Sequence, residues 1–252
     1  MTNSLSLLEI SPLSWALALG ASFLQGFTKA GVKGTAVLSV TLMALALGAR
    51  QSTGLLVPIL ICGDIFAVLY YHRHAQWSYI RKFLPWIIFG VLIGVGVGKD
   101  LPENLFKWAM AVIILGSVLV MLWWDLRKSE KVPEHWTFSG GIGVLAGITT
   151  MVGNLAGAFA NIYFLAMRLP KNEFIGTAAW LFLIINVFKL PFHIWVWKTI
   201  DLEVLKINFF LLPGLALGLL SGIWLVKHIK DAFYRRLILI LTAIGAVVMM
   251  FK

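Results

Sequence analysis

Hydrophobic positions in this chain are gathered into long runs, which are separated by short polar or glycine-rich breaks. An α-helix needs about 20 mostly apolar residues to cross a bilayer, and several of the runs approach or exceed that length. The pattern therefore predicts an all-α polytopic membrane protein. The runs cover residues 13–28, 35–49, 52–71, 83–98, 104–124, 138–152, 155–167, 174–196, 207–226 and 233–251.

Composition and charge agree with this class. Hydrophobic residues make up 60% of the 252 positions and charged residues only 13%, whereas a soluble domain carries about 25% charged residues. The net charge of +10 lies mainly between the apolar runs, which favours orientation in a lipid bilayer over binding of nucleic acid. A single cysteine, Cys62, excludes an intramolecular disulfide and argues against a thiolate metal cluster.

Two pairs of runs are unusually short, and a glycine-rich break joins the members of each pair. They predict helical hairpins over residues 13–49 and 138–167. Short, glycine-interrupted hydrophobic segments at matching places in two halves of a chain point to the binding site of a transporter. The breaks are therefore the first candidates for function.

The two halves match at fixed offsets. An offset of 122 pairs Asp64 with Asn186, and an offset of 128 pairs residues of the later spans. The further pairs are Gly31 with Gly153, Gly54 with Gly176, Phe66 with Phe188, Pro85 with Pro213, Gly90 with Gly218, Gly94 with Gly222, Lys99 with Lys227 and Lys107 with Arg235. The pattern predicts an internal duplication.

Each repeat then holds a hairpin and three spans. The first repeat, 1–125, has spans at 52–71, 83–98 and 104–124; the second, 138–252, has spans at 174–196, 207–226 and 233–251. A hairpin returns to the side on which it began, and three further crossings are odd. The second repeat is therefore predicted to be inverted relative to the first, with 126–137 as the linker.

The basic residues give the orientation. Twelve lysines and arginines fall on one side of this arrangement and six on the other. The richer side is predicted to be cytoplasmic, which places the linker inside and both termini outside the cytoplasm. The three remaining basic residues, Lys29, Lys33 and Lys189, lie within predicted membrane segments.

The first hairpin tip carries positive charge in a stretch that has no acidic residue from Ser11 to Gly63. Lysines at membrane depth by default mark a functional site. An anion could bind Lys29 and Lys33 together with the free N–H groups of a helix that starts at Gly34 and Thr35. The alternative is a shallow hairpin, whose lysines extend to the lipid headgroups.

The second tip is uncharged but rich in hydrogen-bonding groups. Asn154 and Gly157 would lie at the start of the returning helix, where N–H groups are free. Asn154 could contact an anion, serve as the N-cap of the helix, or do both. If the two tips meet near the bilayer midplane, their helix starts form an oxyanion site.

Three polar residues lie inside the first span after a hairpin, one in the first repeat and two in the second. Asp64 and Asn186 occupy equivalent positions, and Lys189 follows Asn186 by three residues, on the same helical face. A buried carboxylate needs a proton or a partner. Asp64 could form an ion pair with Lys29, Lys33 or Lys189, or take part in proton coupling. Lys189 could bind substrate or act in packing only.

Nothing in the sequence indicates an enzyme. The five histidines lack metal-ligand spacing, and no nucleotide-binding or hydrolase motif is present, so neither a metal nor an organic cofactor is expected.

The chain resembles the TauE/SafE sulfite exporter family over essentially its whole length. The most specific stretch is the run from Arg168 to Thr177, with Leu-Pro-Lys and Gly-Thr, followed by Asn186 to Pro191. The first glycine cluster differs, because family members often carry consecutive glycines there. The resemblance implies export of small sulfur oxyanions such as sulfite, sulfoacetate or related sulfonates, without a cofactor.

Residues and resemblance together suggest a secondary transporter of the bacterial cytoplasmic membrane, working by alternating access around a small anionic substrate. An anion channel and a non-transporting membrane scaffold or partner subunit are the alternatives. The exact anion, the coupling ion and the oligomeric state, including a homodimer, stay open.

Overall fold

A computed structural model describes residues 10–32, 35–126, 136–167 and 169–228. Helices make up nearly all of this part of the chain, and it contains no strand. The elements are α1 (Pro12–Lys29), α2 (Thr35–Leu47), α3 (Ala49–Tyr71), η2 (His72–His74), α4 (Trp77–Lys99), α5 (Glu103–Leu126), α6 (Trp136–Gly153), α7 (Ala156–Ala166), α8 (Lys171–Pro191), η3 (Phe192–Val196) and α9 (Leu202–His228). The predicted span 233–251 and most of the linker 126–137 lie outside the described residues.

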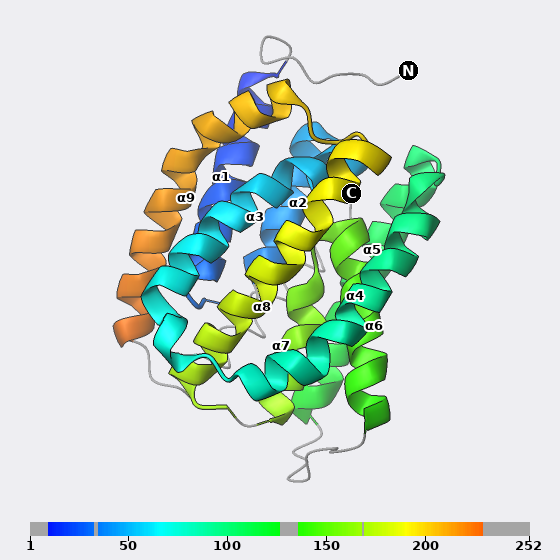
Figure 1. Cartoon of the computed structure of the whole chain (residues 1–252). Coiled ribbons are helices and arrows are strands. Elements are labelled where there is room, and N and C mark those ends of the chain that lie inside the picture. Colours follow the sequence, from blue (N-terminus) through cyan, green and yellow to red (C-terminus); the bar gives the residue numbers. More distant parts are fainter. Residues whose placement is uncertain (1–9, 33–34, 127–135, 168, 229–252) are drawn as a thin grey trace.

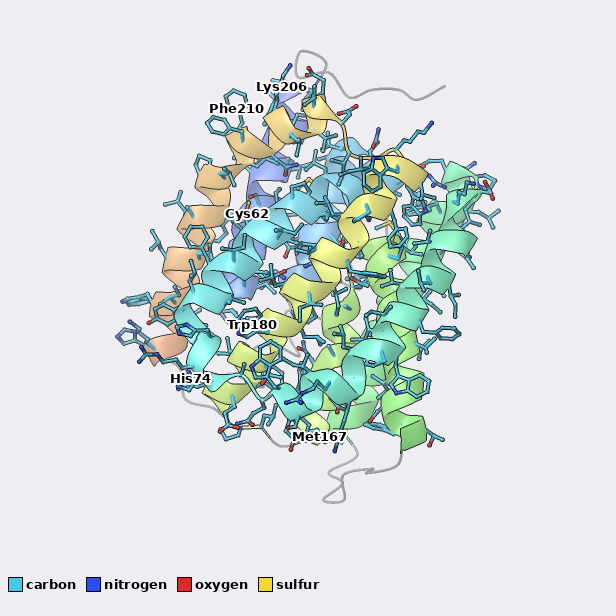
Figure 2. All side chains as sticks on the ribbon, viewed as in Figure 1. Cys62, His74, Met167, Trp180, Lys206 and Phe210 are labelled. Atoms are coloured by element: carbon cyan, nitrogen blue, oxygen red, sulfur yellow. The ribbon has the colours of Figure 1, made fainter. Side chains whose placement is uncertain are left out.

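The predicted class is confirmed. Among the described residues, four helices are long and apolar enough to cross a membrane: Ala49–His74, Trp77–Lys99, Asn172–Val196 and Leu202–Leu225. Large apolar side chains also project from the outer faces of α4, α5 and α9, among them Phe89, Trp108 and Phe210, of which Figure 2 labels Phe210. Such faces suit contact with lipid chains. The chain is a multi-pass, all-helical membrane protein.

Two helices cross at the centre of the bundle. Figure 1 shows α3 and α8 between α1, α2 and α9 on one side and α4, α5 and α6 on the other. A Cβ added at Gly54, near the start of α3, would lie 2.4 Å from the carbonyl oxygen of Thr199, which follows α8. A Cβ at Gly176, near the start of α8, would lie 2.6 Å from the carbonyl oxygen of Tyr71, at the end of α3. The two helices are therefore antiparallel, and each begins beside the end of the other.

A second pair of interfaces joins each hairpin to a span from the other half of the chain. Helix α1 packs along α9, and α6 packs along α4. Glycines allow the close approach: a Cβ at Gly218 of α9 would lie 1.9 Å from the carbonyl oxygen of Phe23, and one at Gly90 of α4 would lie 2.2 Å from that of Val144. Small residues are what bring membrane helices together, because apolar side chains gain nothing by leaving lipid.

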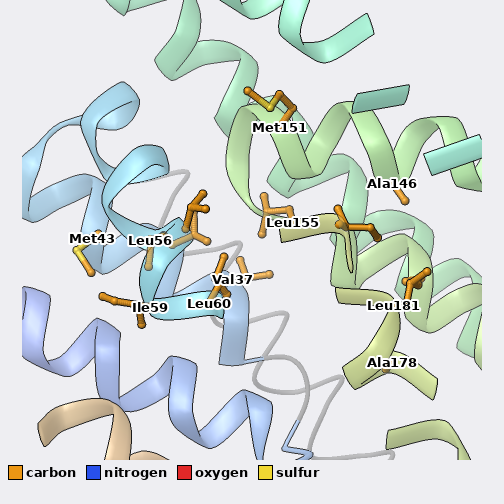
Figure 3. Packing of buried hydrophobic residues seen from close by; sticks show 14 of the residues in the cluster. Val37, Met43, Leu56, Ile59, Leu60, Ala146, Met151, Leu155, Ala178 and Leu181 are labelled. Carbon is orange, nitrogen blue, oxygen red and sulfur yellow. The ribbon is translucent and has the colours of Figure 1, made fainter. Parts of the chain in front are cut away.

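Buried apolar side chains fill the space around the crossing. Figure 3 shows residues of α2 and α3 on one side and residues of the second hairpin and α8 on the other, within one continuous cluster. Val37, Leu56 and Leu155 are each at most 3% exposed. The polar groups of the crossing are thus enclosed by an apolar shell.

Candidate functional site

The first hairpin breaks at a turn that requires glycine. Helix α1 ends at Lys29, and Gly31 has a φ of 115°, a left-handed conformation that residues with a Cβ rarely adopt. The N–H of Gly31 donates to the carbonyl of Thr28 at 3.0 Å, and that of Val32 donates to Phe27 at 3.2 Å. This is a Schellman motif, which satisfies the last carbonyls of a helix. It places Lys29 on the last turn of α1, pointing into the protein.

The second hairpin breaks at an asparagine. Asn154 has a φ of 55°, which asparagine tolerates better than most residues, and its N–H donates to the carbonyl of Thr150 at 3.0 Å. Helix α7 begins two residues later, at Ala156. The turn directs the side chain of Asn154 toward the crossing of α3 and α8.

An ion pair fixes the first hairpin to the crossing. The ammonium of Lys29 donates to Asp64 Oδ1 at 2.6 Å, and Asn186 Nδ2 donates to Asp64 Oδ2 at 2.6 Å. Asp64 is fully buried, and the side chain of Lys29 is only 9% exposed. Asp64 and Asn186, predicted to be equivalent positions, therefore contact each other directly between α3 and α8.

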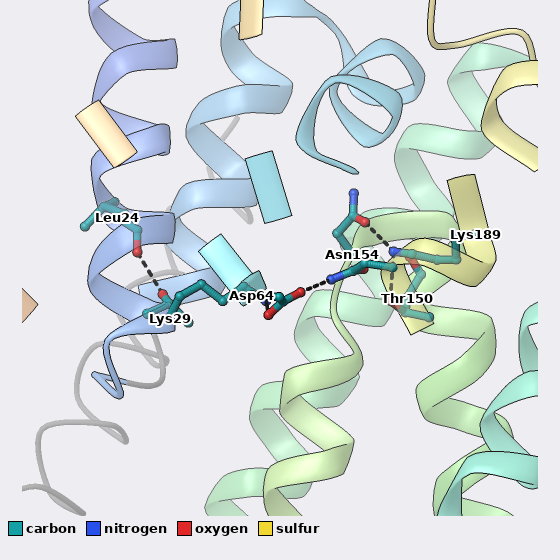
Figure 4. A network of polar contacts seen from close by, with 8 residues as sticks. Leu24, Lys29, Asp64, Thr150, Asn154 and Lys189 are labelled. Atoms are coloured by element: carbon teal, nitrogen blue, oxygen red, sulfur yellow. Dashed lines mark hydrogen bonds and ion pairs between the residues drawn. The ribbon is translucent and has the colours of Figure 1, made fainter. Parts of the chain in front are cut away.

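Lys189 is held by the second hairpin. Its ammonium donates to the carbonyl and the hydroxyl of Thr150, both at 3.1 Å, and to Asn154 Oδ1 at 2.7 Å. Asn154 Nδ2 in turn donates to the carbonyl of Thr53 in α3 at 3.0 Å. Figure 4 shows both halves of this network, with Lys29 and Asp64 at one end and Lys189 at the other.

The two buried lysines of the network differ in whether a carboxylate balances their charge. Asp64 neutralises Lys29 in the first half, but the oxygens that contact Lys189 are all uncharged. Lys189 is 0% exposed, and no carboxylate of the described residues lies within ion-pair distance of it. The carbonyl groups at the C-terminal end of α6 supply only a partial negative charge near the ammonium of Lys189. Lys189 is thus a buried lysine for which the described structure supplies no full counter-charge.

The structure brings some of the predicted site residues together and leaves others apart. Lys29, Asp64 and Asn186 form one connected group, Asn154 and Lys189 form a second, and α8 joins the two. Thr35 is buried at the start of α2, where its hydroxyl lies 2.5 Å from that of Thr28. Gly157 is half-buried in α7, with no polar contact of its own described. Lys33 and Gly34 lie outside the described residues.

Several residues of the network were not among those predicted from the sequence. Thr28 and Thr150 are related by the same offset of 122 that pairs Asp64 with Asn186, so the repeat could have indicated them. Thr53 acts through its main-chain carbonyl, for which no sequence signal exists. Phe182, whose ring centroid lies 5.0 Å from the ammonium of Lys29, looks like any apolar residue of a span.

These features define a class: a polytopic helical membrane protein whose buried lysines lie beside two broken hairpins. Within that class, the chain belongs to the sulfite exporter TauE/SafE family, whose family model matches residues 14–249. The predicted resemblance is confirmed, and membership implies membrane transport of sulfite or similar anions. Comparisons with curated proteins and with solved structures give no match.

Proposed function

We propose that this protein is a secondary transporter that exports a small sulfur oxyanion, such as sulfite, sulfoacetate or a related sulfonate, and that the anion binds at Lys189. The observation that carries the proposal is the buried ammonium of Lys189, for which no carboxylate partner is described. A charge in a medium of low dielectric constant is costly unless it is paired. A bound anion would supply the missing negative charge.

The surroundings of Lys189 suit an oxyanion. All three ammonium protons have acceptors, and the shortest of these bonds is the one to Asn154 Oδ1. An anion would replace that oxygen. The amide of Asn154 could then turn, so that Nδ2 exchanges its bond to the carbonyl of Thr53 for one to the anion. The start of α7, with its free N–H groups, lies two residues further along the chain.

Alternating access is the mechanism that the helix arrangement supports. The interfaces α1–α9 and α4–α6 each join a hairpin of one predicted repeat to a span of the other, and the contacts of Gly54 and Gly176 mirror each other at the two ends of the crossing. Such reciprocal contacts are what two inverted repeats would produce. Rocking of one repeat against the other would expose Lys189 first to one side and then to the opposite side.

The ion pair between Asp64 and Lys29 allows two roles for Asp64. The pair could fasten the first hairpin to α3 permanently, or it could open during transport as Asp64 takes up a proton. The bond of 2.6 Å and the full burial of Asp64 are compatible with both roles. The variants described in the Discussion distinguish them.

Direction and location complete the proposal. In a bacterial cytoplasmic membrane with a negative interior, the potential favours exit of an anion by about 2.3 kcal/mol per charge per 100 mV. Export would then need no coupling ion. The excess of basic residues on one side of the predicted topology supports termini outside the cytoplasm.

The test is flux of labelled sulfite and sulfoacetate in proteoliposomes with Lys189→Met. We expect loss of flux and of the ligand-dependent rise in melting temperature, because the variant removes the charge but keeps the length of the side chain. Lys206→Met is the matched control, since Lys206 is exposed on α9 and, among the described residues, forms an ion pair with Glu203 only. Unchanged flux in Lys189→Met would refute the proposed site.

One observation favours a second candidate, a non-transporting scaffold. Every proton of Lys189 already has an acceptor, so the network could serve only to hold the hairpin in place. This candidate predicts that no sulfur oxyanion raises the melting temperature of the wild-type protein, and that Lys189→Met lowers it in the absence of any ligand.

A further inference from the structure

A histidine lies one turn beyond Lys189 in a widened stretch of helix. Helix α8 ends at Pro191, and Phe192–Val196 continues it as a π-helical turn. Proline lacks the N–H that would continue the α-helical bonding, and π-helical turns are often found at functional sites. His193 lies in this turn and is 0% exposed.

One ring nitrogen of His193 is used and the other is not. Nδ1 lies 2.9 Å from the hydroxyl of Thr199, which fixes the ring orientation. Nε2 is buried, and no hydrogen-bond partner for it exists among the described residues. A buried polar atom without a partner costs free energy, and such an atom in a native protein calls for an explanation.

The position of His193 connects it with the proposed anion site. His193 follows Lys189 by four residues, in the π-helical turn that continues α8. Thr199 also contacts Gly54, the residue after Thr53, whose carbonyl accepts from Asn154. His193 and Lys189 are thus tied to the same short segment of α3.

We propose that His193 is a second ligand of the transported oxyanion, with Nε2 donating a hydrogen bond to an oxygen of an anion whose charge is held by Lys189. In the tautomer that this requires, the hydroxyl of Thr199 donates to Nδ1, and the ring proton is on Nε2. The inference rests on the proposed function of Lys189. It adds that the site contacts at least two oxygens of its ligand, one through Lys189 and one through His193. An oxyanion therefore binds better than a halide of equal charge.

Two substitutions test the two ring nitrogens of His193 separately. The amide oxygen of His193→Asn can occupy the place of Nδ1 and accept from the hydroxyl of Thr199, but nothing replaces Nε2. His193→Gln reaches the place of Nε2 and gives up the Nδ1 contact. We expect similar melting temperatures for the ligand-free wild type and His193→Asn, so that the Asn variant reports on binding rather than on folding.

The measurement is the dissociation constant of sulfite, ethanesulfonate and chloride for purified protein in nanodiscs. A hydrogen bond to a charged group is worth about 1.5–3 kcal/mol, so His193→Asn should weaken sulfite and ethanesulfonate about 10- to 100-fold, and His193→Gln should weaken them less. Chloride affinity should change little in either variant.

The outcomes are distinguishable. If Lys189→Met abolishes binding of sulfite and His193→Asn leaves it unchanged, the role of His193 is refuted and the proposed function stands. An equal loss for chloride and the oxyanions in His193→Asn also refutes it, since the residue would then act only by general packing. If the wild type binds none of the three anions, the proposed function itself fails.

Discussion

The ion pair between Lys29 and Asp64 gives the sharpest test of how the first hairpin is held. Both groups are removed from solvent, and their bond of 2.6 Å is short. Removing one member of a buried pair leaves an uncompensated charge and costs about 3–5 kcal/mol, whereas removing both costs much less. We therefore expect Lys29→Met and Asp64→Asn each to lower the free energy of unfolding by about 3 kcal/mol.

The double variant Lys29→Met/Asp64→Asn should lose only about 1–2 kcal/mol, because neither charge is then left unpaired. The coupling energy of the double-mutant cycle would be about 4–5 kcal/mol. It is measured by reversible unfolding in mixed micelles. The control cycle uses Lys206 and Glu203, an exposed pair also 2.6 Å apart, for which the coupling should not exceed about 0.5 kcal/mol.

Two results would refute this reasoning. Additive effects of Lys29→Met and Asp64→Asn would show that the two groups do not depend on each other, and a coupling as large in the exposed pair would show that burial is irrelevant. Transport by the double variant decides the role of the pair. Flux close to wild type would make it a structural fastening, whereas binding of sulfite without flux would support proton coupling through Asp64.

Further predictions concern the helix interfaces and the second turn. Gly90→Ala should lower the melting temperature strongly, because the added Cβ would lie 2.2 Å from a carbonyl oxygen of α6, whereas Gly96→Ala on the same helix, with nothing within 4 Å, should change it little. An equal loss in both would contradict the close packing of α4 on α6. Asn154→Gly should be more stable than Asn154→Ala by about 1 kcal/mol, since only glycine accepts a φ of 55° freely. Both variants should weaken sulfite binding. The order of stabilities is measured by thermal unfolding, and a reversed order would contradict the left-handed turn.

Much of the architecture could be predicted from the pattern of apolar runs, because lipid demands long, continuous hydrophobic helices. The helix boundaries could not. The span expected from residue 83 begins as α4 at Trp77, and the one expected from 207 begins as α9 at Leu202. Hydropathy detects the part of a helix in the hydrocarbon core, but the helix continues into the polar interface, where charged and aromatic residues are tolerated.

The buried charged residues of the candidate site could be predicted from the sequence, but not how they pair. Lysines and one carboxylate at membrane depth are rare enough to be noticed in a sequence. The sequence left three partners open for Asp64, and the structure shows Lys29 in that place and Lys189 beside Asn154. Which ammonium reaches the carboxylate depends on how two helices distant in sequence are displaced along each other, and helical periodicity carries no information on that displacement.

The contact between Asp64 and Asn186 bears on the history of the chain. If the halves arose by duplication of one inverted subunit, this residue once faced its own copy across a two-fold axis. Two identical carboxylates at such a distance repel each other, and two identical amides leave no acid to meet Lys29. Once the two copies are encoded separately after duplication, the facing residues can differ. Asn186→Asp should accordingly lower the melting temperature more than Asn186→Ala does. A homodimeric ancestor could not have paired an aspartate with an asparagine at this position.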